Sequence, residues 1–431
     1  MIPSPSRPAG VAGTALAVTL AIQVFTSLAG TATSVLAPEI APALGLPTKL
    51  IGVFVGVLYA GGMAASLASG GFVERYGAIR VSQACVLLCA LGLALVAGAG
   101  TSPTLSGLVL TAAALIIGLG YGPITPASSQ VLARTAPRSR MALTFSLKQT
   151  GVPAGAALAG ATLPPLALAL GWRPTLLLVT ALGALVIVAA QPTRRLLDAD
   201  RLPARPLSVR GVLAPLRAVF ASRALAELSL AGFTYAATQV CLMSFLVVYL
   251  TETLGRSLVG AGLALTVANL GGIVGRIGWG AIADRRIPPR RLLGLLGVLS
   301  CLCAVATAAF DARWSPGVLL ALCATFGATA IGWNGVQLAE LARHAPRGQE
   351  GAITGASGFL TLSGVVVGPP AFALLASLTG SYRVGFTVFG IASGLCGAYF
   401  LFSGRRQCPR PDADPTPSRR SSPASRAAIW K

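Results

Sequence analysis

Residues 275–286 read GRIGWGAIADRR, and they close a glycine-rich apolar run with a short charged hairpin. Within this stretch, residues 280–285 place a glycine, three further residues, an acid and an arginine in order. The same order returns much earlier in the chain, in residues 70–75, GGFVER. This repeat predicts two similar halves. Arg276, in contrast, lies inside the apolar run and away from any loop, which indicates a functional role.

The composition is that of a membrane protein. Of the 431 residues, 54% are apolar and 10% are charged, with a mean hydropathy of +0.76, whereas soluble domains carry about 25% charged residues. The net charge of +21 is compatible with nucleic-acid binding. The arginines, however, fall in short loops between apolar runs, as is typical of cytoplasmic loops. We therefore expect a lipid bilayer as partner and no nucleic acid.

The sequence gives no support for a metal site, a cofactor or an enzyme. Its eight cysteines fall mostly inside apolar runs and form no CxxC pair, and His344 is the one histidine. Such cysteines are typical of small packing residues. The chain also lacks the GxxxxGK[ST] loop of an ATP-driven pump. We expect no metal, no cofactor and no catalytic residues.

Twelve apolar segments of membrane-spanning length follow one another along the chain. They lack the alternation of barrel strands, so we expect helices. A cleaved signal peptide is the competing interpretation of the first segment, but the run is too long for one. The expected spans are 11–36, 50–73, 81–100, 105–132, 141–164, 175–191, 225–250, 258–283, 292–310, 318–341, 353–378 and 384–402.

Basic residues set the expected orientation and the domain boundaries. Most of them lie in the loops after even-numbered spans and in the two termini, so both termini are expected in the cytoplasm, with the protein in a bacterial-type inner membrane. An arginine- and proline-rich linker divides the chain. The expected parts are a six-helix bundle at 1–191, a cytoplasmic linker at 192–224, a second six-helix bundle at 225–404 and a disordered tail at 405–431.

Glycines four residues apart recur in corresponding spans of the two halves. Such spacing lets helix backbones approach closely, so the second, fifth, eighth and eleventh spans are candidates for the seam between the halves. Ordinary packing within each half is the alternative. The pairs are Gly52 and Gly56, Gly151 and Gly155, Gly271 and Gly275, and Gly364 and Gly368.

Twelve spans in two halves, a basic central linker and a charged hairpin in each half resemble the major facilitator superfamily. The resemblance covers about residues 11–404. It implies two pseudo-symmetric six-helix bundles and transport by alternating access. It also implies a gating role for the hairpin charges, which would steady one conformation; ordinary loop charge is the alternative. These gating residues are Glu74, Arg75, Asp284 and Arg285.

Two cations lie clearly within the expected spans, Lys148 and Arg276, at similar depth. A charge at the membrane centre costs about 2.5–3.5 kcal/mol on insertion scales. The repeat doubles the hairpin acids Glu74 and Asp284 but neither cation, which favours a ligand rather than a scaffold role. The alternative is that both side chains snorkel to the inner interface, with Arg276 paired to Glu227.

No acid lies deep in any expected span, so the two cations leave a need for negative charge that an anionic substrate would meet. In the family that the chain resembles, helices 1, 4, 7 and 10 face the central cavity. The expected substrate-binding residues are therefore Arg276 and Lys148 with Gln23, Tyr121, Tyr235, Gln239, Trp333 and Asn334.

Together these observations predict a secondary transporter of a small organic anion, such as a carboxylate, by alternating access. The expected partners are this small molecule and a coupling proton or counter-anion, and we expect a monomer. The alternative is an efflux transporter of neutral or anionic amphipathic drug-like compounds. In either case the helix-4 segment around residues 116–123 lacks the arginine common in the family, which argues against proton-driven drug antiport.

Overall fold

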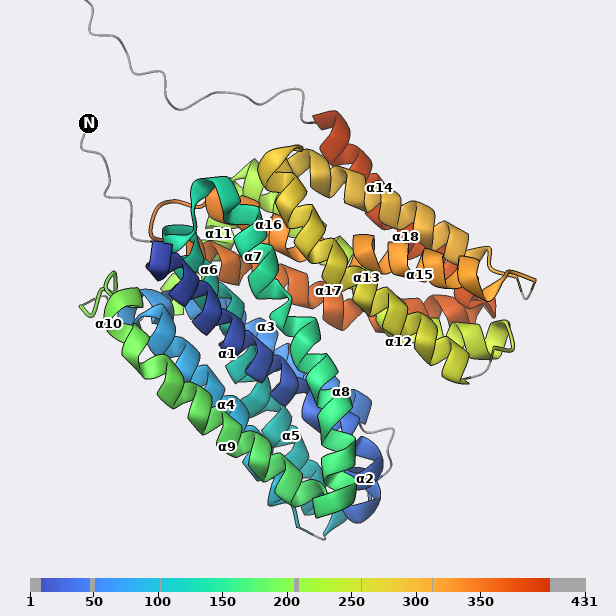
Figure 1. Cartoon of the computed structure of the whole chain (residues 1–431), viewed down its shortest axis with the longest axis horizontal. Helices are drawn as coiled ribbons and strands as arrows, with labels where there is room; N and C mark the ends of the chain where they lie inside the picture. The colour runs from blue at the N-terminus through green and yellow to red at the C-terminus, as the bar shows by residue number, and fades with distance from the viewer. Residues whose placement is uncertain are drawn as a thin grey trace, which may run out of the picture.

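The computed structural model describes residues 9–46, 51–100, 102–204, 209–256, 258–311 and 313–403, and within these ranges every regular element is helical. Figure 1 shows two bundles joined by a linker. The first bundle holds α1 (Ala9–Val35), α2 (Ala37–Ala43), α3 (Ile51–Tyr76), α4 (Ala78–Ala97), α5 (Pro103–Tyr121), α6 (Ile124–Thr135), α7 (Met141–Gln149), α8 (Gly151–Leu170) and α9 (Trp172–Ala190). The linker holds α10 (Arg194–Leu197) and α11 (Val209–Ala221). The second bundle holds α12 (Arg223–Val248), α13 (Leu258–Arg285), α14 (Pro289–Ala308), α15 (Pro316–Ala330), α16 (Asn334–His344), α17 (Glu350–Thr379) and α18 (Tyr382–Ser403).

The helices have the length and polarity of membrane spans. Among the described residues, 11 helical segments are long and apolar enough to cross a membrane, and each matches an expected span. The remaining expected span, 258–283, is the 28-residue helix α13. Large apolar side chains also stand exposed on the bundles, with Leu168 80% and Leu378 74% accessible. Exposure on this scale suits lipid rather than water, so the predicted all-helical membrane fold is confirmed.

The two bundles repeat the same helix pairings. In the first, α1 packs on α8, α3 on α5 and α4 on α9; in the second, α12 packs on α17, α13 on α15 and α14 on α18. These pairs are equivalent in chain order, once α5–α6, α7–α8 and α15–α16 are each taken as one interrupted span. The repeat predicted from the two hairpins is therefore present in three dimensions.

Three of the four glycine pairs pack each half internally. A Cβ atom at Gly155 would lie 2.3 Å from the Val24 carbonyl oxygen of α1, and one at Gly364 would lie 2.3 Å from the Phe233 carbonyl oxygen of α12. Likewise, Gly275 faces the backbone of α15. For these three pairs ordinary packing, the alternative interpretation, was right, and assigning them to the seam was wrong. A Cβ atom at Gly56, in the remaining pair, would meet no described atom within 4 Å.

The predicted seam helices do meet, but through other small residues. α3 packs on α17, and α7 packs on α13 and α16. A Cβ atom at Gly70 would lie 2.6 Å from the Ala352 Cα atom, and one at Gly280 would lie 2.6 Å from the Ser146 hydroxyl oxygen. We call the end of the molecule that holds α10 and α11 the linker end (Figure 1). The halves join at the linker end and diverge toward the end that holds α2.

Three spans are interrupted beside the space between the halves. The helix breaks at Gly122-Pro123 between α5 and α6, at Thr150 between α7 and α8, and at residues 331–333 between α15 and α16. Proline cannot donate a backbone hydrogen bond, which explains the first break. Interruptions at membrane depth leave backbone carbonyls to be satisfied by other groups, and they are tolerated where they are buried in protein or line a cavity.

Candidate substrate site

A cavity of about 900 Å³ lies between the two halves and is lined by both. Its wall combines apolar side chains with a set of polar ones. Among the described lining residues, Arg276 is the one with a charged side chain, and none is Asp or Glu. The main polar lining residues are Ser27, Tyr59, Tyr121, Thr125, Gln149, Gln239, Asn269, Arg276, Asn334 and Gln337.

Arg276 connects the helix breaks of the two halves. It is 2% exposed on α13, and its Nε donates to the carbonyl oxygen of Ile331, at the α15–α16 break, over 3.0 Å. A terminal guanidinium nitrogen donates to the carbonyl oxygen of Gln149, at the α7–α8 break. These bonds use two of the five N–H groups of the guanidinium. Within the described chain the other three have no hydrogen-bond partner, although the side chain borders the cavity.

The snorkelling alternative for Arg276 is wrong. A snorkelling side chain carries its charge to the membrane surface, whereas Arg276 is buried between helix breaks. Its suggested partner, Glu227, instead lies 2.8 Å from the Nε of Arg223 and also contacts Arg290. The guanidinium is therefore held at the cavity wall.

Lys148 is buried behind the wall rather than in it. Its side chain is 1% exposed on α7 and is absent from the lining residues. Its Nζ donates to Gln23 Oε1 at 2.6 Å, to Gln149 Oε1 at 3.0 Å and to Thr125 Oγ1 at 3.4 Å. An ammonium group has three N–H donors, so all three are used on neutral acceptors. Gln23 also lies outside the lining, whereas Gln149 and Thr125 are part of it.

The other predicted binding residues divide between the wall and the packed interior. Tyr121, Gln239, Trp333 and Asn334 line the cavity, and Asn334 Nδ2 donates to Gln239 Oε1 at 3.2 Å. Tyr235 does not line it. The Tyr235 hydroxyl donates to the Leu293 carbonyl oxygen at 2.9 Å, and its ring meets the Trp333 ring edge to face at 5.7 Å.

Sequence reasoning missed Gln149 as a site residue. Gln149 lines the cavity, and it contacts both buried cations through different atoms. The sequence could have indicated it, because a glutamine inside an apolar span is costly to bury without hydrogen-bond partners. Gln149 also directly follows Lys148 in the chain. Tyr59, which meets the Tyr121 ring edge to face at 6.2 Å, was also missed.

The predicted gating acid Asp284 joins the two halves at the linker end. Its carboxylate oxygens accept from the backbone N–H of Ala142 at 2.9 Å and of Leu143 at 2.8 Å. These N–H groups belong to the first turn of α7, where a negative charge is favourable. Arg343 of α16 lies 3.4 Å from the same carboxylate. Arg285 is exposed.

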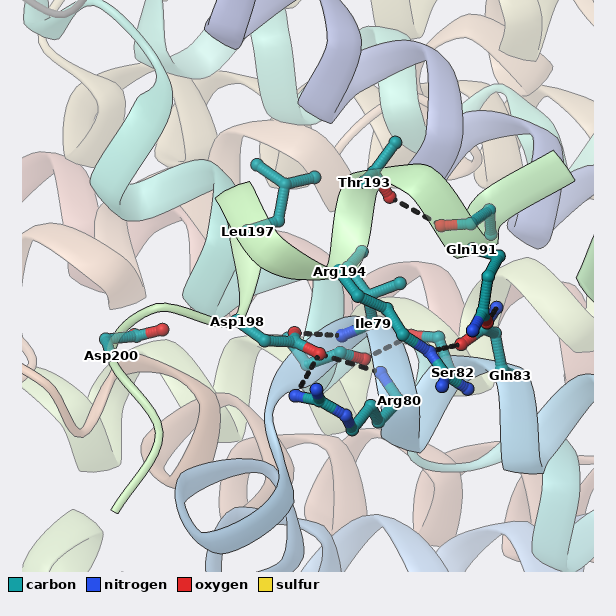
Figure 2. Close-up of polar contacts among 12 residues, drawn as sticks. Ile79, Arg80, Ser82, Gln83, Gln191, Thr193, Arg194, Leu197, Asp198 and Asp200 are labelled. Atoms are coloured by element: carbon teal, nitrogen blue, oxygen red, sulfur yellow. Dashed lines mark hydrogen bonds and ion pairs between the residues drawn. The ribbon is translucent and has the colours of Figure 1, made fainter. Parts of the chain in front are cut away.

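In the first half, Asp198 caps a helix in the same manner as Asp284. The Asp198 carboxylate accepts from the backbone N–H of Ile79 at 2.7 Å and of Arg80 at 3.2 Å, at the start of α4 (Figure 2). Burial raises the pKa of the Asp198 carboxyl, and the two backbone N–H groups oppose that rise. Gly77 has φ +97°, and a Cβ atom there would lie 2.4 Å from Asp198 Cγ. This position therefore requires glycine.

The hairpin residues Glu74 and Arg75 lie beside this cap. Glu74 is buried, and its backbone carbonyl oxygen accepts from the Leu202 N–H at 2.7 Å. The Arg75 guanidinium lies 5.4 Å from the centre of the neighbouring Tyr76 ring. The start of the linker is thereby attached to the ends of α3 and α4.

Comparisons with known proteins were made for sequence and for structure. A family model described as Major Facilitator Superfamily matches residues 19–364, and no curated protein matches the sequence. Three solved structures of similar fold are a fucose:proton symporter from E. coli, a bacterial homologue of the iron transporter ferroportin in an outward-facing state, and the human organic anion transporter MFSD10. Their TM-scores are 0.70, 0.73 and 0.70, with 18%, 18% and 19% identity. The matches cover 91%, 92% and 92% of this chain and 98%, 100% and 100% of the respective structures.

Proposed function

The chain belongs to the major facilitator superfamily, and we propose that its cargo is a small organic anion such as a carboxylate. As a member of this family the protein is a multi-pass secondary transporter of small molecules, and not an enzyme. The names of the three similar structures refer to different substrates, and the three share at most 19% sequence identity with this chain. They establish the fold alone, so the choice of substrate rests on the cavity.

The observation that carries the proposal is the Arg276 guanidinium at the cavity wall. It is the one charged group among the described lining residues, and three of its N–H groups have no hydrogen-bond partner in the described chain. A planar guanidinium suits the two oxygens of a carboxylate. No carboxylate of the described lining offsets this charge. A bound anion supplies the missing negative charge.

For transport, we propose that the linker end is cytoplasmic and that the two halves rock about the cavity. With this orientation, the described conformation is closed toward the cytoplasm by the contacts of α7 with α13 and of α3 with α17. The hairpin charges of Glu74, Arg75, Asp284 and Arg285 would then bias the equilibrium between conformations rather than bind the substrate.

The test is carboxylate binding by purified protein, measured as thermal stabilisation and as uptake into liposomes. The panel comprises acetate, succinate, benzoate and decanoate, each paired with its neutral primary amide. We expect a carboxylate to bind better than its amide, and Arg276→Gln to weaken its affinity about tenfold or more. Arg276→Lys retains the positive charge but lacks the planar guanidinium with its paired donors, so the loss of carboxylate affinity should be smaller.

Arg173 offers a matched control for Arg276. It also donates to two backbone carbonyl oxygens, those of Ala97 at 3.1 Å and Ala99 at 2.8 Å, but it lies outside the cavity lining. Arg173→Gln should leave affinity unchanged. Unchanged carboxylate affinity in folded Arg276→Gln, or no carboxylate binding at all, would overturn the proposal.

The size and apolar wall of the cavity favour a second candidate function. A volume of about 900 Å³ bordered by Leu58, Val152, Met243 and Leu265 could hold an amphipathic compound. In that case the protein would export neutral or anionic drug-like molecules. Binding of decanoate and decanamide with equal affinity, insensitive to Arg276→Gln, would favour this function over anion transport.

A further inference from the structure

We infer that Gln149 of the first half binds the anionic substrate beside Arg276 of the second half, and that Lys148 orients the Gln149 side-chain amide for this purpose. The inference rests on the proposed function, since it assigns further donors in the same cavity. It gives the site one contact from each half. It also gives Lys148 a defined role without any direct contact with the substrate.

The contacts of Lys148 determine which way the Gln149 amide is turned. An ammonium group can only donate hydrogen bonds, so the Gln149 atom 3.0 Å from Lys148 Nζ must be the oxygen Oε1. The amide nitrogen Nε2 then points away from Lys148. Within the described chain Nε2 has no hydrogen-bond partner, although Gln149 is only 5% exposed and borders the cavity. This nitrogen is therefore available to donate a hydrogen bond to a ligand in the cavity.

The position of Gln149 at a helix break places this residue next to Arg276. The backbone carbonyl oxygen of Gln149 is itself bound by the Arg276 guanidinium. The two side chains therefore offer N–H groups to the same region, one set from α7 and one from α13. A carboxylate has two oxygens with about four acceptor positions, so it can accept from both. Binding of this kind holds an anion between the two halves.

Lys148 is a positioning residue in this arrangement. Its hydrogen bonds to Gln23 Oε1 and Thr125 Oγ1 fix the ammonium group between α1, α6 and α7. The fixed ammonium keeps the carbonyl side of the Gln149 amide turned inward. Without it, the amide could rotate and present its oxygen to the cavity, where it would repel an anion.

The first experiment replaces the amide donors of Gln149 while keeping its contact with Lys148. Gln149→Glu retains an acceptor for Lys148, so folding should be preserved, but it offers a carboxylate in place of the N–H donors. With the tightest-binding carboxylate of the panel, we expect affinity to fall about tenfold or more. Gln149→Met removes the N–H donors without adding charge, and it should lower carboxylate affinity several-fold. Gln83→Met changes a buried glutamine outside the cavity lining and should have no effect.

The second experiment tests the positioning role of Lys148 by a double-mutant cycle. Lys148→Met should weaken carboxylate binding severalfold in the wild-type background and have little effect in the Gln149→Met background. A residue that acts through its own charge would weaken binding equally in both backgrounds, and that result would overturn the positioning role. Binding of the neutral amide should be unaffected by Lys148→Met.

The outcomes separate this inference from the proposed function. If Arg276→Gln weakens carboxylate binding while Gln149→Glu and Gln149→Met bind normally, the inference is wrong and anion transport stands. If Arg276→Gln also binds normally, or if no carboxylate of the panel binds, both are wrong. Loss of carboxylate affinity in all three variants, with normal folding in each, supports both.

Discussion

The carboxylate of Asp284 lies 2.9 Å from the backbone nitrogen of Ala142, although the two residues belong to opposite halves of the transporter. Asp284 lies in the last turn of α13, and Ala142 is in the first turn of α7. The contact thus uses the partial positive charge of a helix N-terminus to hold the halves together at the linker end. It must break if the halves separate there.

Asp284→Asn should therefore favour separation of the halves at the linker end. An amide lacks the negative charge and can accept with only one oxygen, so both the α7 cap and the Arg343 ion pair are weakened. Ser146 is buried in this seam, so a Ser146→Cys reporter should be labelled faster by a thiol reagent in the Asp284→Asn variant. Transport should be slower, with substrate affinity within a few-fold of the wild-type value. The exposed Asp311→Asn is the control. Loss of substrate binding by folded Asp284→Asn would contradict a gating role.

Gly77→Ala should destabilise the first half. The residue has φ +97°, and the added Cβ atom would overlap the Asp198 carboxyl. Gly77 combines this φ with a ψ of 148°, a backbone region in which other residues are strained by about 1–3 kcal/mol before any clash is counted. Gly98→Ala is the matched control, because Gly98 has φ −84° and its Cβ atom would meet nothing closer than 3.5 Å. The apparent melting temperature in detergent should fall for Gly77→Ala alone; equal values for the two variants would contradict the overlap.

The raised pKa of Asp198 predicts the direction of a pH effect. In the folded protein burial raises this pKa above the value of about 3.9 found in unfolded chains. The folded state thus holds the proton more tightly, and the stabilisation from this carboxyl is present at low pH and is lost as pH rises through the raised pKa. Asp198→Asn cannot titrate. The difference in melting temperature between wild type and Asp198→Asn should therefore shift against the wild type as pH rises from about 4 to about 7; a shift in its favour would refute the assignment.

The orientation can be tested with two single-cysteine variants. Ser315 is exposed at the start of α15, and Pro288 is exposed in the hairpin before α14, at opposite ends of the molecule. If the linker end is cytoplasmic, a thiol reagent that cannot cross membranes labels Ser315→Cys in intact cells and labels Pro288→Cys only after lysis. The reverse pattern would place the linker end outside the cell.

Hydropathy and the hairpin repeat were sufficient to predict the helices and the two halves, and the glycine pairs pointed to the helices that form the seam. They could not show which glycines face the seam, because four-residue spacing looks the same on either side of a helix. Gly155 faces α1 within its own half, whereas Gly70 faces Ala352 across the seam. Only the relative rotation of packed helices separates the two cases.

The candidate site was predicted only in part, and the reason is similar. A charge inside an apolar span is visible in the sequence, and so Arg276 was found. Whether a side chain borders the cavity depends on its rotation about the helix and on the helix breaks. Lys148 and Gln149 are neighbours in sequence, yet Gln149 borders the cavity and Lys148 does not. Tyr235 likewise donates to the Leu293 carbonyl within the second half.

The attachment of the linker to the first half determines where the gene could be divided to express the halves as separate polypeptides. Asp198 caps α4, Arg134 of α6 binds the Leu197 carbonyl and the Asp200 carboxylate, and Leu202 is bound to the Glu74 carbonyl. A first fragment that stopped at residue 191 would leave the start of α4 uncapped and Arg134 without these acceptors. A fragment that continues through residue 204 carries its own cap, and so it is the better starting point for reassembling the transporter from two pieces.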